Sequence, residues 1–491
     1  MQGHHARFPK NAPSARLLLT VLVLLLSPGA RAADVATVVA QVDAGRFTQA
    51  EKQIGQGLAE PGLGKATRAA LLFERERMRR IRLDFPLGEA EAKSRLAKLI
   101  PDLEAEEFAE WKKTNQLEHV EIDGTPWYFQ RSVSNLFLLD KQAAARRQPP
   151  ANPTLGPLET PHPHHHQVVT EALATGKHSV TPNRVQVTYT LTVNANAVPA
   201  GETVRAWLPF PRELPGQQQD IKLIETVPAE HQVAPVTAMQ RTVYLEKPAV
   251  AGRTTDFSIT YELTVFAQRH AIDVKKVVVA TRTPELASFL AQRPPHIVFT
   301  DDLRAFSRKV VGDEKNPYLI ARKLYAAVDA IPWAGAREYS TLSNISDYAL
   351  HAGHADCGQQ TLLLMTLLRL NGIPTRWQSG WTFSDTGYDN MHDWAWLYLA
   401  PVGWVPMDVT YGRFATGDEA IDGFYLGGMD AYRIAFNDDF SRAFIPAKQH
   451  VRSETVDSQR GEAEWRGGNL YFDQWDYSFK FKLLQDSSET Q

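Results

Sequence analysis

The chain has 491 residues, of which 43% are hydrophobic, 10% aromatic and 22% charged, and its formal net charge is −3. This composition supplies enough apolar material for folded domains and excludes an intrinsically disordered chain; the length predicts about three domains. A net charge near zero gives no long-range basic field, so we expect neither nucleic acid nor an anionic membrane surface as the main partner.

Residues 1–32 have the pattern of a secretory signal peptide. Basic residues precede an apolar run over residues 17–26, and Ala30 and Ala32 suit the positions before a cleavage site. The run is too short to span a bilayer, and no later stretch is long and apolar enough. We therefore expect a secreted or periplasmic protein with no transmembrane segment after signal removal.

Residues 33–140 are expected to form a mostly helical N-terminal region, because apolar residues return there at spacings of three and four. Residues 141–182 are rich in proline, which predicts a linker. Residues 162–166 of this linker read His-Pro-His-His-His. We do not expect them to bind a metal, since no acidic or cysteine partner lies nearby in the sequence.

Residues 183–268 are predicted to form an antiparallel β-sandwich. Apolar and polar residues alternate from Val185 to Val193 and again from Phe257 to Val265, which is the pattern of half-buried strands. The length of this region is close to that of an immunoglobulin-type domain. We expect it to act as a scaffold.

Residues 300–415 return to a mixed α and β pattern and contain Cys357, the one cysteine of the chain. A single cysteine allows neither an intramolecular disulfide nor a cysteine-based zinc site. The apolar run after Cys357 ends at Asn371-Gly372-Ile373-Pro374, which predicts a helix over about 358–370 with the cysteine in its first turn. The N–H groups and dipole of a helix start favour a thiolate, so Cys357 is a candidate nucleophile.

A thiolate nucleophile needs a base and a group that orients the base. His392 begins a predicted strand, and a turn at residues 400–403 separates this strand from a second one that ends near Asp408. A hairpin would bring Asp408 beside His392. We predict that His392 takes the thiol proton and that Asp408 holds the imidazole in one tautomer.

The order of these motifs resembles the core of the transglutaminase-like superfamily. The motifs are the cysteine at a helix start, the sequence from Arg369 to Arg376, His392-Asp393-Trp394, and the Gly-Trp-Val-Pro-Met-Asp of residues 403–408. The resemblance runs from near Tyr318 to Tyr411. It implies an α+β, papain-like catalytic domain, here preceded by the helical region and the β-sandwich.

Two acidic residues depart from the pattern of this superfamily. Asp393 stands where a small residue is usual, and Asp356 precedes Cys357, where its charge would oppose a thiolate unless it caps the helix. For the oxyanion we expect the Cys357 N–H as first donor, with the side chain of Gln359 or Trp333 as candidates for the second.

Residues 416–491 are expected to pack on the catalytic core as a C-terminal extension. The adjacent carboxylates Asp438 and Asp439 lack the alternating ligand spacing of a calcium loop. We therefore expect no metal and no cofactor.

The resemblance implies an enzyme that acts on amide bonds of peptides or proteins through an acyl-thioester, with water as acceptor rather than an amine. Peptide, glycopeptide and cell-wall peptide substrates all stay open, as does the oligomeric state. The alternative is a non-catalytic protein-binding module that retains the fold. A thiol that anchors the chain to a partner by a disulfide is a third possibility.

Overall fold

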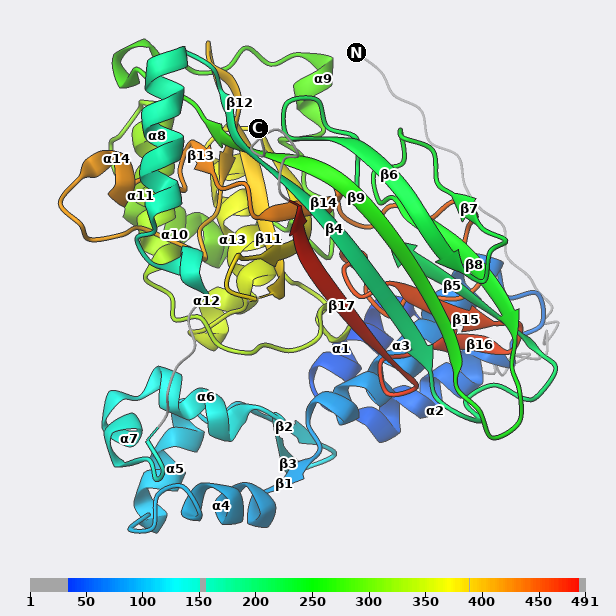
Figure 1. The fold of residues 1–491 in the computed structure, drawn as a ribbon. Coiled ribbons are helices and arrows are strands. Elements are labelled where there is room, and N and C mark those ends of the chain that lie inside the picture. Colours follow the sequence, from blue (N-terminus) through cyan, green and yellow to red (C-terminus); the bar gives the residue numbers. More distant parts are fainter. Residues whose placement is uncertain (1–33, 151–155, 388, 485–491) are drawn as a thin grey trace, which may run out of the picture.

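The structure is a computed structural model that describes residues 34–150, 156–387 and 389–484. The predicted signal peptide lies outside these residues. Figure 1 shows the β-sandwich beside the mixed α and β unit, with the N-terminal helices below them.

The N-terminal region is helical and includes a small antiparallel sheet. Its helices are α1 (Val35–Asp43), α2 (Phe47–Leu58), α3 (Lys65–Asp84), α4 (Glu89–Ala97), α5 (Ala105–Lys113), α6 (Ser132–Leu139) and α7 (Lys141–Arg146), and its strands are β1 (Leu87–Gly88), β2 (His119–Ile122) and β3 (Thr125–Tyr128). Arg77 and Arg80 of α3 are buried and donate to the main-chain oxygens of Thr341 and Ser453. These contacts join the region to the rest of the protein.

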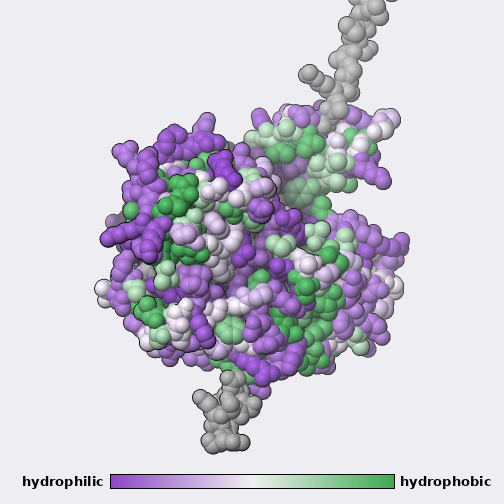
Figure 2. Space-filling view, turned by 90° about the horizontal axis from the view of Figure 1, so that it is seen from above, coloured by the Kyte–Doolittle hydropathy of each residue, from purple (hydrophilic) through white to green (hydrophobic). Residues whose placement is uncertain are grey.

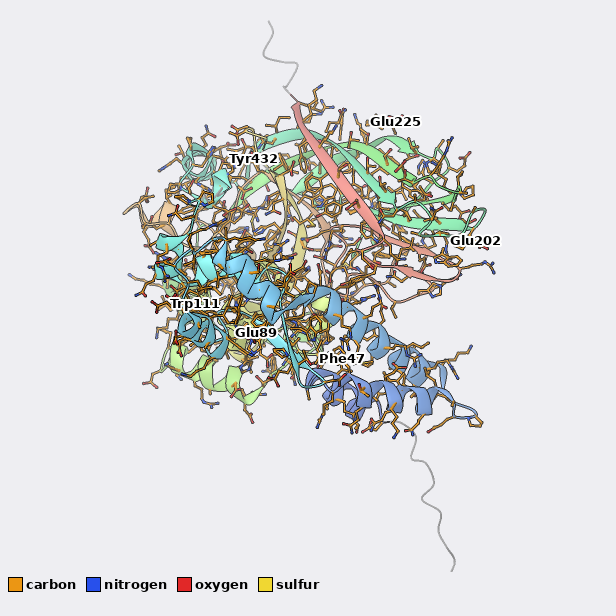
Figure 3. All side chains as sticks on the ribbon, turned by 90° about the horizontal axis from the view of Figure 1, so that it is seen from below. Phe47, Glu89, Trp111, Glu202, Glu225 and Tyr432 are labelled. Carbon is orange, nitrogen blue, oxygen red and sulfur yellow. The ribbon has the colours of Figure 1, made fainter. Side chains whose placement is uncertain are left out.

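Figure 3 gives a second view of this arrangement. Glu89 and Trp111 label the N-terminal helices in the lower part of that view, whereas Glu202 and Glu225 label the sandwich at the upper right.

The expectation of a linker over residues 141–182 is wrong for most of its length. After a 3₁₀ turn at Pro157–Glu159, helix α8 covers Pro163–Thr175 and contains most of the histidine cluster. A proline in its first turn favours this helix start. The proline- and histidine-rich composition does not predict this helix, because its histidines are stabilised by packing against distant parts of the chain.

Two buried histidines attach helix α8 to the rest of the protein. His164 Nε2 accepts a hydrogen bond from the Ala431 N–H at 3.1 Å, and His165 Nε2 lies 3.0 Å from Tyr425 Oη. Burial lowers the pKa of both histidines to about 4, so both are neutral at pH 7.

Two five-stranded antiparallel sheets form the β-sandwich. One has the order β13, β9, β4, β17, with β6 also paired to β9, and the other has the order β16, β15, β5, β8, β7. The strands are β4 (Ser179–Val193), β5 (Thr203–Pro209), β6 (Gln218–Val227), β7 (Gln232–Val233), β8 (Thr242–Pro248), β9 (Thr255–Arg269), β13 (Gly428–Met429), β15 (Glu462–Trp465), β16 (Gly468–Leu470) and β17 (Trp475–Leu484). Alternate residues of β4 and β9 are buried between the sheets.

The sandwich extends beyond its predicted boundaries. Strands β15, β16 and β17 belong to it, so the described residues 416–484 do more than pack on the mixed α and β unit. Strand β17 pairs with β4 from Trp475, opposite Val193, to Leu484, opposite Arg184. Without β17, one edge of β4 would present unpaired N–H and C=O groups to solvent.

The mixed α and β unit holds a four-stranded antiparallel sheet in the order β12 (Gly403–Met407), β11 (Asp389–Leu399), β10 (Thr375–Phe383), β14 (Arg433–Asn437). Its helices are α9 (Pro284–Ala287), α10 (Asp301–Val311), α11 (Pro317–Asp329), α12 (Tyr348–Ala352), α13 (Cys357–Leu370) and α14 (Glu419–Asp422), with 3₁₀ turns at Val274–Lys276 and Tyr339–Thr341. The leucines of α13 share a core with Ala395 and Leu397 of β11. Trp381 and Phe383, near the end of β10, join the core of the sandwich instead.

Among the residues that the structure describes, no helix is long and apolar enough to cross a membrane. Figure 2 shows one face of the molecule, on which hydrophobic patches are separated by hydrophilic surface.

Candidate active site

Cys357 is the first residue of α13. Asp356 Oδ1 accepts a hydrogen bond from the Gln359 N–H at 3.0 Å, and Gln359 Oε1 accepts from the Asp356 N–H at 3.4 Å. The two residues form a capping box that fixes the helix start. Residues 358–369 are buried, so the thiol stands on a rigid element.

Gly358 permits the close contact between this helix start and the sheet. A β-carbon on Gly358 would lie 2.0 Å from Tyr339 Oη and 2.6 Å from Asp393 Oδ2. A side chain at this position would therefore have to displace Tyr339 and Asp393 or move the start of the helix.

The hairpin of β11 and β12 brings His392 and Asp408 together. His392 Nε2 lies 2.7 Å from Asp408 Oδ2, and both side chains are buried. Because an ionised carboxylate can only accept, Nε2 donates this hydrogen bond, which leaves Nδ1 as the nitrogen for a thiol or a substrate. The ring of Tyr411 stacks on the imidazole with 4.6 Å between centroids and restricts its rotation.

Arg433 on β14 extends this pair into a buried charge network. Its Nη1 lies 2.9 Å from Asp408 Oδ2, and its Nη2 contacts Asp430 Oδ2. Burial alone would raise the pKa of Asp408, but the neighbouring His392, through its hydrogen bond, and the positive charge of Arg433 hold it below its ordinary value. Asp408 therefore stays ionised, as a group that orients a histidine must.

Arg433 is a site residue that sequence reasoning missed. It lies 25 positions after Asp408 and reaches it only because β14 pairs with β10, which local sequence patterns do not reveal. Gly380 of β10, opposite His392, makes the pairing possible, since a β-carbon there would lie 1.8 Å from the main-chain oxygen of Ile434.

The thiol contacts Asp393. Cys357 Sγ lies 3.4 Å from Asp393 Oδ2, and no hydrogen bond joins Cys357 to His392, both of which belong to the described residues. Neighbouring residues of a strand point to opposite faces, so the side chains of His392 and Asp393 leave β11 on different sides. The structure thus brings His392 and Asp408 into direct contact. The Cys357 thiol instead contacts Asp393, the residue after His392.

A buried group of carboxyls surrounds this contact. Asp393 and Asp457 are both buried, and the charge of Asp457 opposes ionisation of Asp393. Gln459 Nε2 donates to Asp393 Oδ1 at 2.7 Å, and Tyr339 Oη lies 3.2 Å from Asp393 Oδ2. Burial and the neighbouring Asp457 raise the pKa of Asp393 well above its ordinary value. Sequence reasoning noticed Asp393 but could not find Asp457, which follows more than sixty positions later.

These surroundings favour the neutral thiol. Burial, and then the charges of Asp393 and Asp356, raise the pKa of Cys357 well above its ordinary value. This opposes the effect of the helix start. A thiolate at Cys357 therefore forms more easily when Asp393 is protonated, because a neutral carboxyl does not repel it.

The candidates for a second oxyanion donor differ in availability. Gln359 is fully buried, its Oε1 accepts in the capping box, and its Nε2 donates to the main-chain oxygen of Arg337 at 3.1 Å. It is therefore committed to the fold. Trp333 is 47% exposed and forms a parallel bridge with Ala355, two residues before the cysteine, so it lies at the edge of the site.

Asp438 and Asp439 are both engaged in polar contacts. Asp438 Oδ1 accepts from Gln378 Nε2 at 2.9 Å, and Asp439 Oδ1 lies 2.7 Å from Arg293 Nη1. In residues 34–150, 156–387 and 389–484, no group of three or more His, Cys, Asp or Glu residues is arranged to hold a metal ion.

Residues 304–409 match the family model of the transglutaminase-like superfamily. This confirms the resemblance of the catalytic core and its α+β class. A search of curated proteins gave no match.

Solved structures give weaker likenesses. A candidate cysteine protease from Cytophaga hutchinsonii is 14% identical with a TM-score of 0.41, and the match covers 62% of this chain and 92% of that one. The periplasmic domain of TgpA from Pseudomonas aeruginosa, bound to ethylmercury, is 12% identical with a TM-score of 0.24, over 48% of this chain and 92% of that one.

Proposed function

We propose that this chain, whose residues 304–409 form a transglutaminase-like core, is a secreted or periplasmic cysteine enzyme. It attacks amide bonds of peptides or proteins with Cys357, assisted by His392 and Asp408, and passes the acyl group to water.

The observation that carries the proposal is the hydrogen bond of 2.7 Å between His392 Nε2 and Asp408 Oδ2. It fixes the tautomer that leaves Nδ1 free to accept a proton, and Arg433 keeps Asp408 ionised. Together with a cysteine at the start of a buried helix, this supplies a nucleophile, a base and an orienting group.

The reaction requires a rearrangement at the start of β11 that brings Cys357 Sγ from Asp393 to His392 Nδ1, because the side chains of His392 and Asp393 lie on opposite faces of this strand in the structure. Sγ attacks the carbonyl carbon of the amide while Nδ1 takes the thiol proton. The same proton then passes to the amide nitrogen, the C–N bond breaks, and an amine leaves a thioester behind. Water attacks this thioester, gives a proton to Nδ1, and releases the carboxylic acid and the regenerated thiol.

Hydrolysis is favoured over transfer to an amine because water is the acceptor in largest excess. Cross-linking would require a cleft that excludes water while a lysine side chain approaches. The proposed substrates are peptides or proteins, including glycopeptides and cell-wall peptides.

The first test measures the rate of Cys357 labelling by iodoacetamide against pH, in wild type and in His392→Ala. The proposal expects faster labelling near neutral pH in wild type than in the variant, because His392 accepts the thiol proton. A thiol that titrates at the same alkaline pH in both proteins contradicts it.

The second test identifies the acceptor. A peptide library is incubated with the protein and a primary amine, and the products are analysed by mass spectrometry, with Cys357→Ser as control. Free acids that require Cys357 support hydrolysis, and amine adducts support transfer. Neither product over many peptides contradicts the proposed substrate class.

One observation favours a second candidate, a non-catalytic binding module. Cys357 Sγ contacts the carboxyl of Asp393, and its pKa is raised by burial and by that carboxyl. A module of this kind would keep its stability and partner binding in Cys357→Ser and would yield no Cys357-dependent product.

A further inference from the structure

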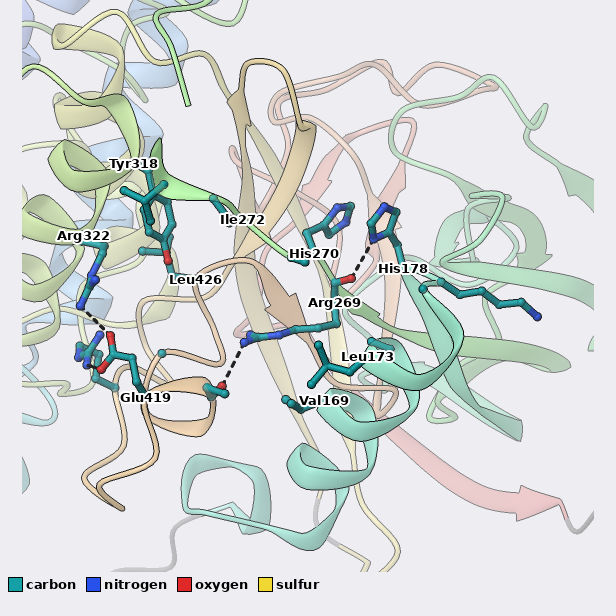
Figure 4. Close-up of a pocket in the computed structure, with 18 residues that line it drawn as sticks. Val169, Leu173, His178, Arg269, His270, Ile272, Tyr318, Arg322, Glu419 and Leu426 are labelled. Atoms are coloured by element: carbon teal, nitrogen blue, oxygen red, sulfur yellow. Dashed lines mark hydrogen bonds and ion pairs between the residues drawn. The ribbon is translucent and has the colours of Figure 1, made fainter. Parts of the chain in front are cut away.

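A pocket of about 420 Å³ lies away from the triad, among α8, the end of β9, the start of α11 and α14. Figure 4 shows its walls, with Val169 and Leu173 on one side, Tyr318, Leu426, Arg322 and Glu419 on the other, and Arg269 extending between them. Neither Cys357, His392 nor Asp408 lines it. Its volume is in the range of pockets that hold small molecules.

The pocket carries more positive than negative charge. Arg322 Nη2 lies 2.7 Å from Glu419 Oε1, and Arg413 Nη2 lies 3.2 Å from Glu419 Oε2, so two guanidinium groups share one carboxylate. The two guanidinium groups thus carry more positive charge than this one carboxylate supplies negative charge. An arginine fork of this kind suits a carboxylate or phosphate.

Arg269 adds a second cation. Its Nη1 and Nη2 donate to the main-chain oxygens of Phe424 and Ala420 at 3.3 and 3.2 Å. These are neutral acceptors, and within the described part of the chain no carboxylate forms a salt bridge with Arg269. Burial lowers the pKa of this guanidinium, but an arginine keeps its charge in proteins.

The other walls of the pocket are apolar. Leu173 of α8 is 74% exposed, and Val169 and Ala172 lie on the same face of the helix. Ile272 and Leu426 complete this surface. An exposed leucine beside a concave apolar wall is typical of a ligand-binding surface.

We propose that this pocket binds a small amphipathic anion, with an apolar chain or ring against Leu173, Val169 and Leu426 and a single carboxylate or phosphate on the arginines. The guanidinium groups of Arg269, Arg322 and Arg413 select the anionic group. The apolar wall selects the apolar chain or ring of the ligand. A small anion without such a chain, or an apolar chain without the anionic group, therefore binds weakly.

The test uses the full-length protein and the fluorescence of 8-anilinonaphthalene-1-sulfonate, which is itself an amphipathic anion. The bound dye is displaced by decanoate, decyl phosphate, decanol or acetate. Decanoate or decyl phosphate should displace it at concentrations at least tenfold lower than decanol and acetate, and the stronger of the two identifies the anionic group. Equal displacement by decanol and decanoate overturns the proposal.

Two variants assign the signal to this pocket. Leu173→Glu adds a negative charge at the rim and should weaken displacement by decanoate at least tenfold. Val279→Glu, at a residue that is 70% exposed and outside the pocket, is the matched control and should behave as wild type. Arg322→Gln should weaken decanoate and leave decanol unchanged. Wild-type decanoate binding in Leu173→Glu overturns the proposal, and urea denaturation shows that each variant is folded.

Discussion

Cys357 Sγ and Asp393 Oδ2 lie 3.4 Å apart, so the candidate nucleophile rests on the carboxyl that follows the candidate base in the sequence. The preceding side chain of the strand, His392, contacts Asp408 on the opposite face of β11. The two faces of one strand thus divide the site into a charged network around the base and a carboxyl group around the thiol.

Asp393→Asn should lower the pKa of the Cys357 thiol. Burial is the largest cause of the raised pKa and is unchanged by this substitution, but the charge of Asp393, the next cause, is removed. The pH midpoint of iodoacetamide labelling should therefore move to lower pH. Asp476→Asn, an exposed residue of β17, is the control and should not move it. An unchanged or higher midpoint in Asp393→Asn would show that the carboxyl does not control the thiol.

Arg433→Met should destabilise the protein by about 3–5 kcal/mol, because it leaves Asp408 and Asp430 as buried carboxylates without their cation. Urea denaturation measures the change. Arg442→Met is the control, since Arg442 is 52% exposed on the side chain and its pair with Asp439 is worth less than about 1 kcal/mol. Equal losses in the two variants would contradict a special role for the buried network.

The parts of the site that sequence predicts depend on local patterns. The helix that starts at Cys357 follows from its cap and its Asn-Gly end, and the hairpin that carries His392 follows from a short turn. Arg433 and Asp457 could not be predicted, because they reach the site through strand pairing and packing across long stretches of chain.

The same distinction applies to the fold. Alternation in β4 and β9 predicts two strands of the sandwich, since each pattern is contained in one segment. Strand β17 pairs with the edge of β4, although the paired residues are almost three hundred positions apart in the sequence. The alternation of apolar and polar residues in β17 predicts a strand but does not identify its partner. The polar residues His164 and His165 suggest a linker, yet both are buried by packing against residues 425–431.

Glu454→Gln should reduce the loss of stability at alkaline pH. Burial, and then the charge of Asp457, raise the pKa of Glu454 to about 8 from its ordinary value of 4.5. The folded state therefore holds a proton that the unfolded state has lost. The contribution of Glu454 to the free energy of unfolding is fully present below pH 4.5 and is lost as the pH rises through 8.

Between pH 6.5 and 8, this group accounts for a fall of up to about 2 kcal/mol in the free energy of unfolding, at about 1.4 kcal/mol per pH unit. Urea denaturation at both pH values should show a smaller fall in Glu454→Gln than in wild type. Glu225→Gln, at an exposed residue of β6, should match wild type. The same fall in all three proteins would contradict a protonated Glu454.

Gly358→Ala and Gly55→Ala should have opposite effects, although both place alanine in a helix. At Gly55, in the exposed face of α2, a β-carbon meets nothing within 4 Å, so alanine should stabilise by about 0.5–1 kcal/mol through helix propensity. At Gly358 the β-carbon would lie 2.0 Å from Tyr339 Oη. Tyr339 and Asp393 are both buried and hydrogen-bonded, so neither can move without breaking a contact.

Overpacking of this kind costs about 1–3 kcal/mol, which exceeds the gain in helix propensity and reverses the sign. The helix start should also shift, and with it the thiol, so Gly358→Ala should change the pH profile of Cys357 labelling while Gly55→Ala leaves it unchanged. Denaturation midpoints and labelling rates on the same samples test both effects. A stabilised Gly358→Ala with a wild-type labelling profile would mean that the close approach of α13 to Asp393 does not set the position of the thiol.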